Sequence, residues 1–165
     1  MNAAIRCRLL EGLPDQTLEL MSSLSTLTNY EPQKLLFREG EPANVFYIVL
    51  RGAIAIEVDG LGARTVLQTL GRGEVLGWSW LFEPFVWHFD ARAVRQTRAL
   101  RVNAESLRQE CDRDQTLALE MYKRFSRIVV RRLQACRLQM LEVHGHRNRP
   151  TSPAEAARGS QSVSR

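Results

Sequence analysis

The period of the apolar residues changes twice along the chain and divides it into three segments. Before residue 28, apolar side chains recur on one face of a helix, and Pro14 suits its first turn. These positions are Leu13, Leu18, Met21 and Leu24. After residue 33, short runs rich in Val, Ile, Phe and Tyr alternate with glycine turns, which predicts antiparallel strands. The runs cover residues 34–38, 45–51, 53–58, 64–70, 89–94 and 98–102.

These runs predict a mainly β fold with flanking helices. Together with the stretch between residues 70 and 89, the runs make about seven or eight strands. We expect these strands to form a jelly-roll β-barrel. Asn103 is a plausible N-cap for a short helix that ends near Cys111. A long helix is then predicted from Asp114 to about Val143, because this stretch contains neither Gly nor Pro. We expect Gly145 to end it.

Three regions follow from this pattern. Residues 1–112 form the barrel with its N-terminal and short C-terminal helices, 113–144 form the long helix, and 145–165 form a basic tail. The tail is rich in Ser, Pro and Arg and has almost no large apolar side chains, so we expect it to be disordered. Its four arginines make it either a weak handle for anionic partners or a solubilising end.

The long helix carries two apolar stripes. The first (Ala118, Met121, Phe125 and Ile128) is expected to dock on the barrel. The second alternates spacings of three and four, as in a two-stranded coiled coil, and only a serine interrupts it. This seam consists of Leu119, Tyr122, Ser126, Val129, Leu133, Cys136, Met140 and Val143. It predicts a parallel homodimer through residues 114–143; the alternative is that both stripes are buried within one subunit.

Composition excludes several classes of protein. No apolar run approaches the ~20 residues that span a bilayer, and no secretory signal begins the chain, so we expect a cytoplasmic protein without membrane contact. Cys7, Cys111 and Cys136 are widely separated, which fits a reducing compartment. With three histidines, no cysteine pair, no nucleophile–base pattern and no P-loop, we expect neither a metal site nor an enzyme.

Three stretches resemble one family. Residues 36–52 resemble the front of cyclic-nucleotide-binding domains, 71–77 the opening of their phosphate-binding cassette, and 90–94 the strand that leaves it. The flanking helices are similar to those of the catabolite-activator and Fnr group of bacterial regulators. The resemblance implies a cassette that holds a cyclic nucleotide, cAMP or cGMP, and a last helix that transmits the ligand state to a dimer interface. Those regulators continue into a helix-turn-helix domain, which the 22 residues from His144 cannot form, so we expect no direct sequence-specific DNA binding.

The expected ligand site lies in this cassette and the strand after it. Its candidate residues are Gly73, Glu74, Gly77, Trp78, Ser79, Trp80, Trp87, His88 and Arg92. The resemblance makes Glu74 the ribose-binding glutamate; the alternative is an acid facing solvent. Trp87 stands where the resemblance places the phosphate-binding arginine, and no Arg or Lys lies between Glu74 and Arg92. Arg92 either turns inward or points to solvent.

Aromatic residues fill the cassette. Six of the twelve in the chain fall within it: Trp78, Trp80, Phe82, Phe85, Trp87 and Phe89. They form two short alternating sets split by Glu83-Pro84 and either close the pocket or build an apolar, stacking site for a ligand. His88 is either a packed histidine or an axial haem ligand.

Two functions follow from these alternatives. The first is a non-catalytic sensor of a small molecule. The second is a ligand-free, dimeric adaptor that binds a downstream protein, with Arg124, Arg127 and Arg131 or the tail contacting an acidic partner. An open cavity beside Glu74 would favour the sensor, and indole rings that fill it would favour the adaptor.

Overall fold

The computed structural model describes residues 7–60 and 63–147, with side chains up to residue 141 except 139. The chain divides into two compact units, Met1–Ile128 and Val129–Arg165, which we describe separately. Most of the predicted basic tail lies outside the described residues.

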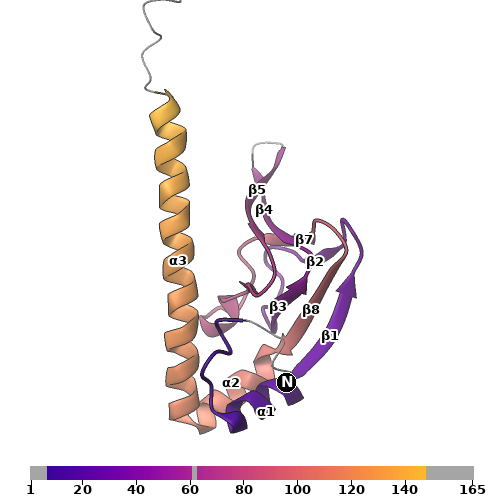
Figure 1. Ribbon diagram of the computed structural model, residues 1–165, viewed down its shortest axis with the longest axis vertical. Helices are drawn as coiled ribbons and strands as arrows, with labels where there is room; N and C mark the ends of the chain where they lie inside the picture. Colours follow the sequence, from indigo (N-terminus) through magenta and orange to yellow (C-terminus); the bar gives the residue numbers. More distant parts are fainter. Residues whose placement is uncertain (1–6, 61–62, 148–165) are drawn as a thin grey trace, which may run out of the picture. The chain divides into compact units, whose positions relative to one another are not determined.

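Eight strands of the first unit form two four-stranded antiparallel sheets (Figure 1). One sheet has the order β1-β8-β3-β6, with β1 at Ser25–Tyr30, β8 at Thr97–Asn103, β3 at Val45–Arg51 and β6 at Val75–Leu76. The other has the order β2-β7-β4-β5, with β2 at Leu35–Phe37, β7 at Asp90–Ala93, β4 at Ile54–Gly60 and β5 at Ala63–Leu70. Neighbours in each sheet are mostly distant in sequence, as in a jelly roll. The predicted mainly β fold is confirmed.

The predicted N-terminal helix is too long. Helix α1 covers Asp15–Ser23, and the residues that follow form β1, where Leu27 pairs with Leu100 of β8. The apolar pattern alone could not show that the helix ends at Ser23. Residues 24–27 continue the helical period only weakly, and pairing with β8 overrides it. Strand β6 was also not predicted, since two residues are too few to display a period.

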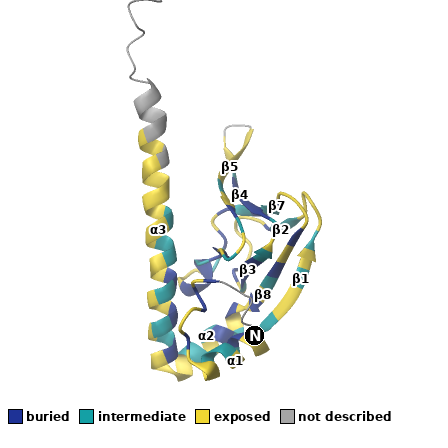
Figure 2. Ribbon diagram, viewed as in Figure 1, coloured by how far each residue is buried: buried dark blue, intermediate teal, exposed yellow. Residues whose placement is uncertain are grey.

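A core of buried apolar side chains lies between the sheets and continues under the helices (Figure 2). Helix α2 covers Ala104–Arg113, and the Asn103 side chain caps it by accepting a 2.9 Å hydrogen bond from the backbone N–H of Ser106, as predicted. Helix α3 covers Gln115–Arg147. In its first part Met121 and Phe125 are fully buried, which confirms the stripe expected to dock on the barrel.

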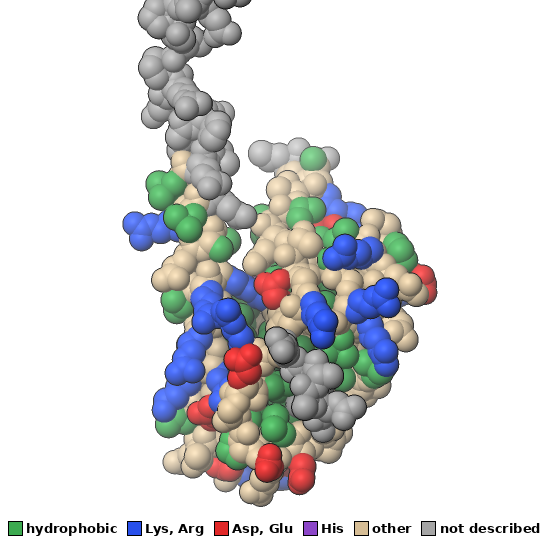
Figure 3. All heavy atoms as spheres, in the orientation of Figure 1, with side chains coloured by type: hydrophobic (Ala, Val, Ile, Leu, Met, Phe, Trp, Pro, Cys, Tyr) green, Lys and Arg blue, Asp and Glu red, His purple; other side chains and the backbone are tan. Residues whose placement is uncertain are grey.

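The second unit begins within α3. The helix continues to Arg147, so the prediction that Gly145 ends it is wrong. A glycine inside a helix costs only about 1 kcal/mol and need not end it. Most large apolar side chains described in this unit are exposed, and Figure 3 shows hydrophobic groups among Lys and Arg along this part of α3. They are Val130, Leu133, Leu138, Met140 and Leu141.

Candidate functional site

The cassette begins with a tight turn at the surface. Gly73 has a positive φ of 81°, a conformation that glycine adopts without strain. The backbone N–H of Gly71 donates a 2.6 Å hydrogen bond to Oε2 of Glu74, and the N–H of Gly73 donates to the carbonyl of Val49. The Glu74 side chain is exposed. Its carboxylate therefore closes its own turn.

Trp87 lies inside the barrel. Its ring is 2% exposed and stacks on Phe37 of β2, with centroids 3.7 Å apart and planes 9° apart. Its far edge lies over Gly77, where an added Cβ would come within 2.6 Å of Cη2 of the indole. Only a glycine lets the indole lie this close. The family's expected arginine position thus holds a ring that closes the barrel interior.

Further rings extend this stack across the sheets. Phe37 also lies 6.1 Å from the ring of Tyr47 and 6.0 Å from that of Phe89, and all three are buried. Burial raises the pKa of the Tyr47 hydroxyl, and the neighbouring Tyr30 adds to the effect.

Trp80 joins the cassette to helix α3. It lies in the short 3₁₀ helix η1, Ser79–Leu81, and is fully buried. Its ring centroid is 5.6 Å from Phe46 of β3 and 5.2 Å from Phe125 of α3. The Trp80 Nε1 and Ser79 Oγ atoms are buried without a hydrogen-bond partner in the protein.

The remaining rings lie at the surface. Trp78 is half-buried and lies 6.2 Å from the exposed His88 and 6.3 Å from Phe82. Phe82 in turn lies 6.3 Å from Tyr122 of α3. The predicted grouping of the rings by alternation is therefore wrong for residues 78–82, because a 3₁₀ turn has a period of three. Only Trp80 of that set points inward.

Arg92 takes part in a buried ion pair. Its Nε atom lies 3.1 Å from Oε2 of Glu57 on β4, and one of its terminal nitrogens donates to the carbonyl of Gln33. The exposed Arg64 approaches the same carboxylate at 3.5 Å. The guanidinium of Arg92 is thus engaged in neutralising Glu57 and is not directed at the stacked rings.

Arg108 of α2 was missed by the sequence analysis. It donates to the carbonyl of Trp80 at 3.0 Å and to Oδ1 of Asn44 at 3.0 Å. Its guanidinium also lies 4.5 Å from the centre of the Phe85 ring. No local signal could have revealed it, because its partners are 28 and 64 residues away. Arg108 fixes the position of η1 against α2.

These residues do not fit a cyclic nucleotide. The phosphate needs a cation, but residues 75–91 carry no Arg or Lys, and Arg92 and Arg108 are both bound to other groups. The orphaned donor of Trp80 and the hydroxyl of Ser79 are enclosed by protein. Arginine normally recognises phosphate through paired, charge-assisted bonds, and residues 75–91 offer none.

A family model for the cyclic nucleotide-binding domain matches residues 27–114. Because this match covers more than half of the chain, the chain belongs to the cyclic nucleotide-binding domain family. The resemblance inferred from residues 36–52, 71–77 and 90–94 is confirmed. A search among curated proteins gave no match.

Solved structures show the same fold. A cyclic nucleotide-binding domain from Methylobacillus flagellatus is 14% identical, with a TM-score of 0.72 over 84% of this chain and 79% of that chain. The catabolite activator protein of Thermus thermophilus is 23% identical, with a TM-score of 0.65 over 83% of this chain and 63% of that one. The regulatory domain of Toxoplasma gondii PKA, solved with cAMP, is 19% identical, with a TM-score of 0.58 over 64% and 41%. At these identities the likeness establishes the fold.

Two further properties concern the described residues alone. None of the helices there has the length and apolar character required to cross a membrane. Those residues also contain no group of three His, Cys, Asp or Glu side chains placed to hold a metal ion.

Proposed function

We propose that this chain is a non-catalytic regulatory module whose barrel takes no cyclic nucleotide and which acts through protein contacts along α3. The observation that carries this proposal is the stack of Trp87 on Phe37 over Gly77. The rings occupy the barrel interior, which favours the adaptor over the sensor.

Two costs argue against a nucleotide in the cassette. Losing a charge-assisted bond to the phosphate weakens binding by about tenfold to a hundredfold. The ligand would also have to displace Trp87, which is almost completely buried. A ligand shifts a conformation only by its differential affinity for the two states. A weakly held nucleotide does not provide that difference.

Titration calorimetry tests this part of the proposal. With cAMP or cGMP at millimolar concentration, we expect no saturable heat and no thermal shift. A matched Trp87→Phe variant keeps an apolar ring and also lacks an arginine, so it should bind no better. Saturable binding of either nucleotide to the native chain would contradict the proposal.

The exposed seam of α3 supports a parallel homodimer through residues 114–143. Most of its described members are exposed, among them Leu119 and Tyr122 in the first unit and Leu133, Cys136 and Met140 in the second, while Val129 is half-buried. Leu133 is 68% exposed, and coiled-coil pairing would cover a side chain of this kind.

Cys136 provides a direct test, because it is exposed and belongs to the seam. In a parallel, in-register dimer the two Cys136 residues face each other within reach of a disulfide. Mild oxidation should therefore cross-link the native chain but not a Cys136→Ser variant, and sedimentation should show a dimer for both. A monomer at micromolar concentration would contradict the dimer.

The candidate surface for an acidic downstream partner is smaller than the sequence suggested. Arg124 bonds Glu120 at 2.6 Å and donates to the carbonyls of Leu9 and Glu11, so its role is structural. Arg127 and Arg131 are exposed and remain as the contact residues of the proposal. The cytoplasmic location and the absence of catalysis also remain predictions.

A further inference from the structure

A hollow of about 580 Å³ lies where strands β3 and β8 meet the turns at their ends. It is formed by the turn between β3 and β4, the turn between β7 and β8, and one residue of β1. Its lining consists of Asn29, Arg51, Gly52, Arg95, Gln96, Thr97 and Arg98. Its volume is in the range of small-molecule sites.

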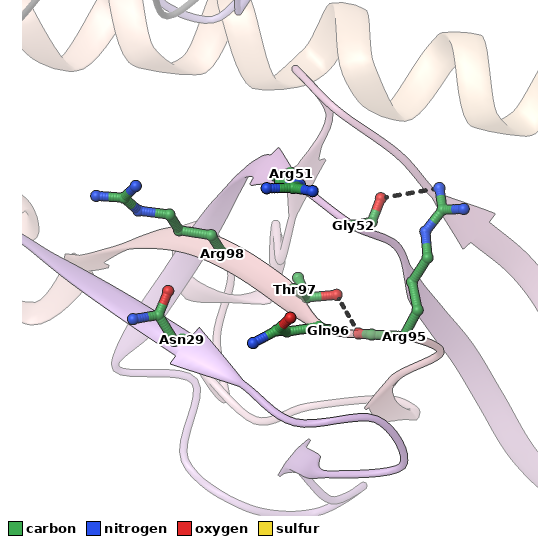
Figure 4. Close-up of a pocket in the computed structure, with 7 residues that line it drawn as sticks. All are labelled: Asn29, Arg51, Gly52, Arg95, Gln96, Thr97 and Arg98. Atoms are coloured by element: carbon green, nitrogen blue, oxygen red, sulfur yellow. Dashed lines mark hydrogen bonds between the residues drawn. The ribbon is translucent and has the colours of Figure 1, made fainter.

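Three of the seven lining residues are arginines, and none is acidic. Figure 4 shows the guanidinium groups of Arg98, Arg51 and Arg95 in a row from left to right. None of the ion pairs found in the described part of the chain involves them, and Arg95 makes only a long 3.4 Å contact with the carbonyl of Gly52. The hollow therefore carries three positive charges without a carboxylate partner.

Two of these arginines repel each other in the absence of a bound anion. Arg51 of β3 is paired with Arg98 of the adjacent β8 next to a bulge in the strand pair, and like charges at facing positions destabilise such a pair. An anion between them would convert this repulsion into attraction. The strand pairing brings these arginines together although 47 positions separate them in the sequence.

The two turns that carry the arginines are fixed to each other. The buried hydroxyl of Thr97 accepts a hydrogen bond from the N–H of Ala53 at 3.1 Å and lies 2.7 Å from the carbonyl of Arg95. Gly52 has a φ of 95°, and a Cβ there would collide with Thr97. Because the backbone under the hollow is held in this way, binding requires ordering of the side chains only.

We propose that this hollow binds a small molecule through a chain of phosphate groups. A row of guanidinium groups suits an extended anion with successive negative charges, since each can pair bidentately with a phosphate. The amide side chains of Asn29 and Gln96 line the same hollow and offer donors and acceptors to the rest of such a molecule. A nucleoside triphosphate and inorganic tripolyphosphate share this chemistry.

Calorimetry on the full chain tests the proposal with tripolyphosphate, ATP and uncharged adenosine. We expect the first two to bind in competition with each other and adenosine not to bind. Each of Arg51→Gln, Arg95→Gln and Arg98→Gln should weaken binding by about tenfold, the effect of one charge-assisted bond. The control Arg113→Gln removes the same charge from an exposed residue at the end of helix α2, which follows the opposite end of β8, and should leave the affinity unchanged.

Comparing the affinities of ATP and tripolyphosphate shows whether the phosphates belong to a nucleotide. If ATP binds more tightly than tripolyphosphate and Asn29→Ala removes this difference in affinity, the ligand is a nucleotide. Equal affinities indicate recognition of the phosphate chain alone. Either result supports the site. Absence of binding at millimolar concentration, or an equal loss in Arg113→Gln, would overturn it. So would binding of a poly-glutamate peptide that tripolyphosphate does not displace. Binding of cAMP that survives Arg98→Gln would instead count against the proposed function of the cassette.

Discussion

The Nε atom of Arg92 lies 3.1 Å from Oε2 of Glu57, and together the two side chains connect β7 to β4 in the sheet that holds Trp87's neighbour Phe37. The Glu57 side chain is 8% exposed and that of Arg92 16%. A carboxylate this buried depends on its cation, because taking an unpaired charge out of water is costly.

Replacing Arg92 with Met should therefore destabilise the fold. We expect a loss of about 2–3 kcal/mol, somewhat less than the 3–5 kcal/mol typical of a broken buried pair, because Arg64 still approaches the carboxylate. Urea denaturation measures this loss. The double variant Arg92→Met with Glu57→Leu should recover part of it. An additive or larger loss in the double variant would show that the ion pair is not the cause.

Gly77→Ala tests the contact between the cassette backbone and Trp87. The new Cβ would collide with the indole, and φ at this residue is +96°, so we expect a loss of about 1–3 kcal/mol. Thermal denaturation and the near-ultraviolet circular dichroism of the tryptophans report it. Gly60→Ala is the control, since nothing lies within 4 Å of a Cβ there. Equal stability of the two variants would contradict the packing described here.

The three cysteines should differ in reactivity. Burial and the nearby Asp112 and Asp114 raise the pKa of Cys111 to about 11, and burial also raises the pKa of Cys7. Because the thiolate is the reactive form, iodoacetamide at neutral pH should modify the exposed Cys136 first at protein concentrations too low for the proposed dimer, in which pairing would cover Cys136. Mass spectrometry after timed quenching ranks the sites. Early modification of Cys7 would contradict the burial of its thiol.

The raised pKa of Cys111 also predicts a loss of stability in alkali. The unfolded thiol ionises near its ordinary value of 9.0, whereas the folded one ionises near 11. Ionisation above pH 9 therefore stabilises the unfolded state first, and the free energy of unfolding should fall as the pH rises from 9 to 11. Cys111→Ser should show a smaller fall over this range in urea denaturation. Identical pH profiles would exclude Cys111 as the source.

Arg98→Gln should stabilise the protein in the absence of any ligand. The substitution removes one of two facing like charges, which is worth about 0.2–1 kcal/mol. The gain should shrink as salt screens the repulsion. Thermal denaturation at low and high ionic strength measures both effects. Destabilisation at low salt would show that Arg98 has a structural partner.

The sequence was sufficient for the framework of the protein. Alternating apolar runs and glycine turns predicted most strands of the barrel, because burial of one face of a strand imposes a period of two. The cap at Asn103 and the buried stripe at Met121 and Phe125 were predicted for equally local reasons. The motifs in residues 36–52, 71–77 and 90–94, taken in order with the flanking helices, were sufficient to identify the family.

The tertiary structure decided the chemistry of the cassette, since each feature there depends on residues far apart in the chain. Trp87 stacks on Phe37, Arg92 pairs with Glu57, and Arg108 reaches the carbonyl of Trp80. The row of Arg51, Arg95 and Arg98 likewise exists only because β3 and β8 are paired. Periodicity along a chain reports which face of an element is buried, whereas the partner buried against it is set by the packing of the whole barrel.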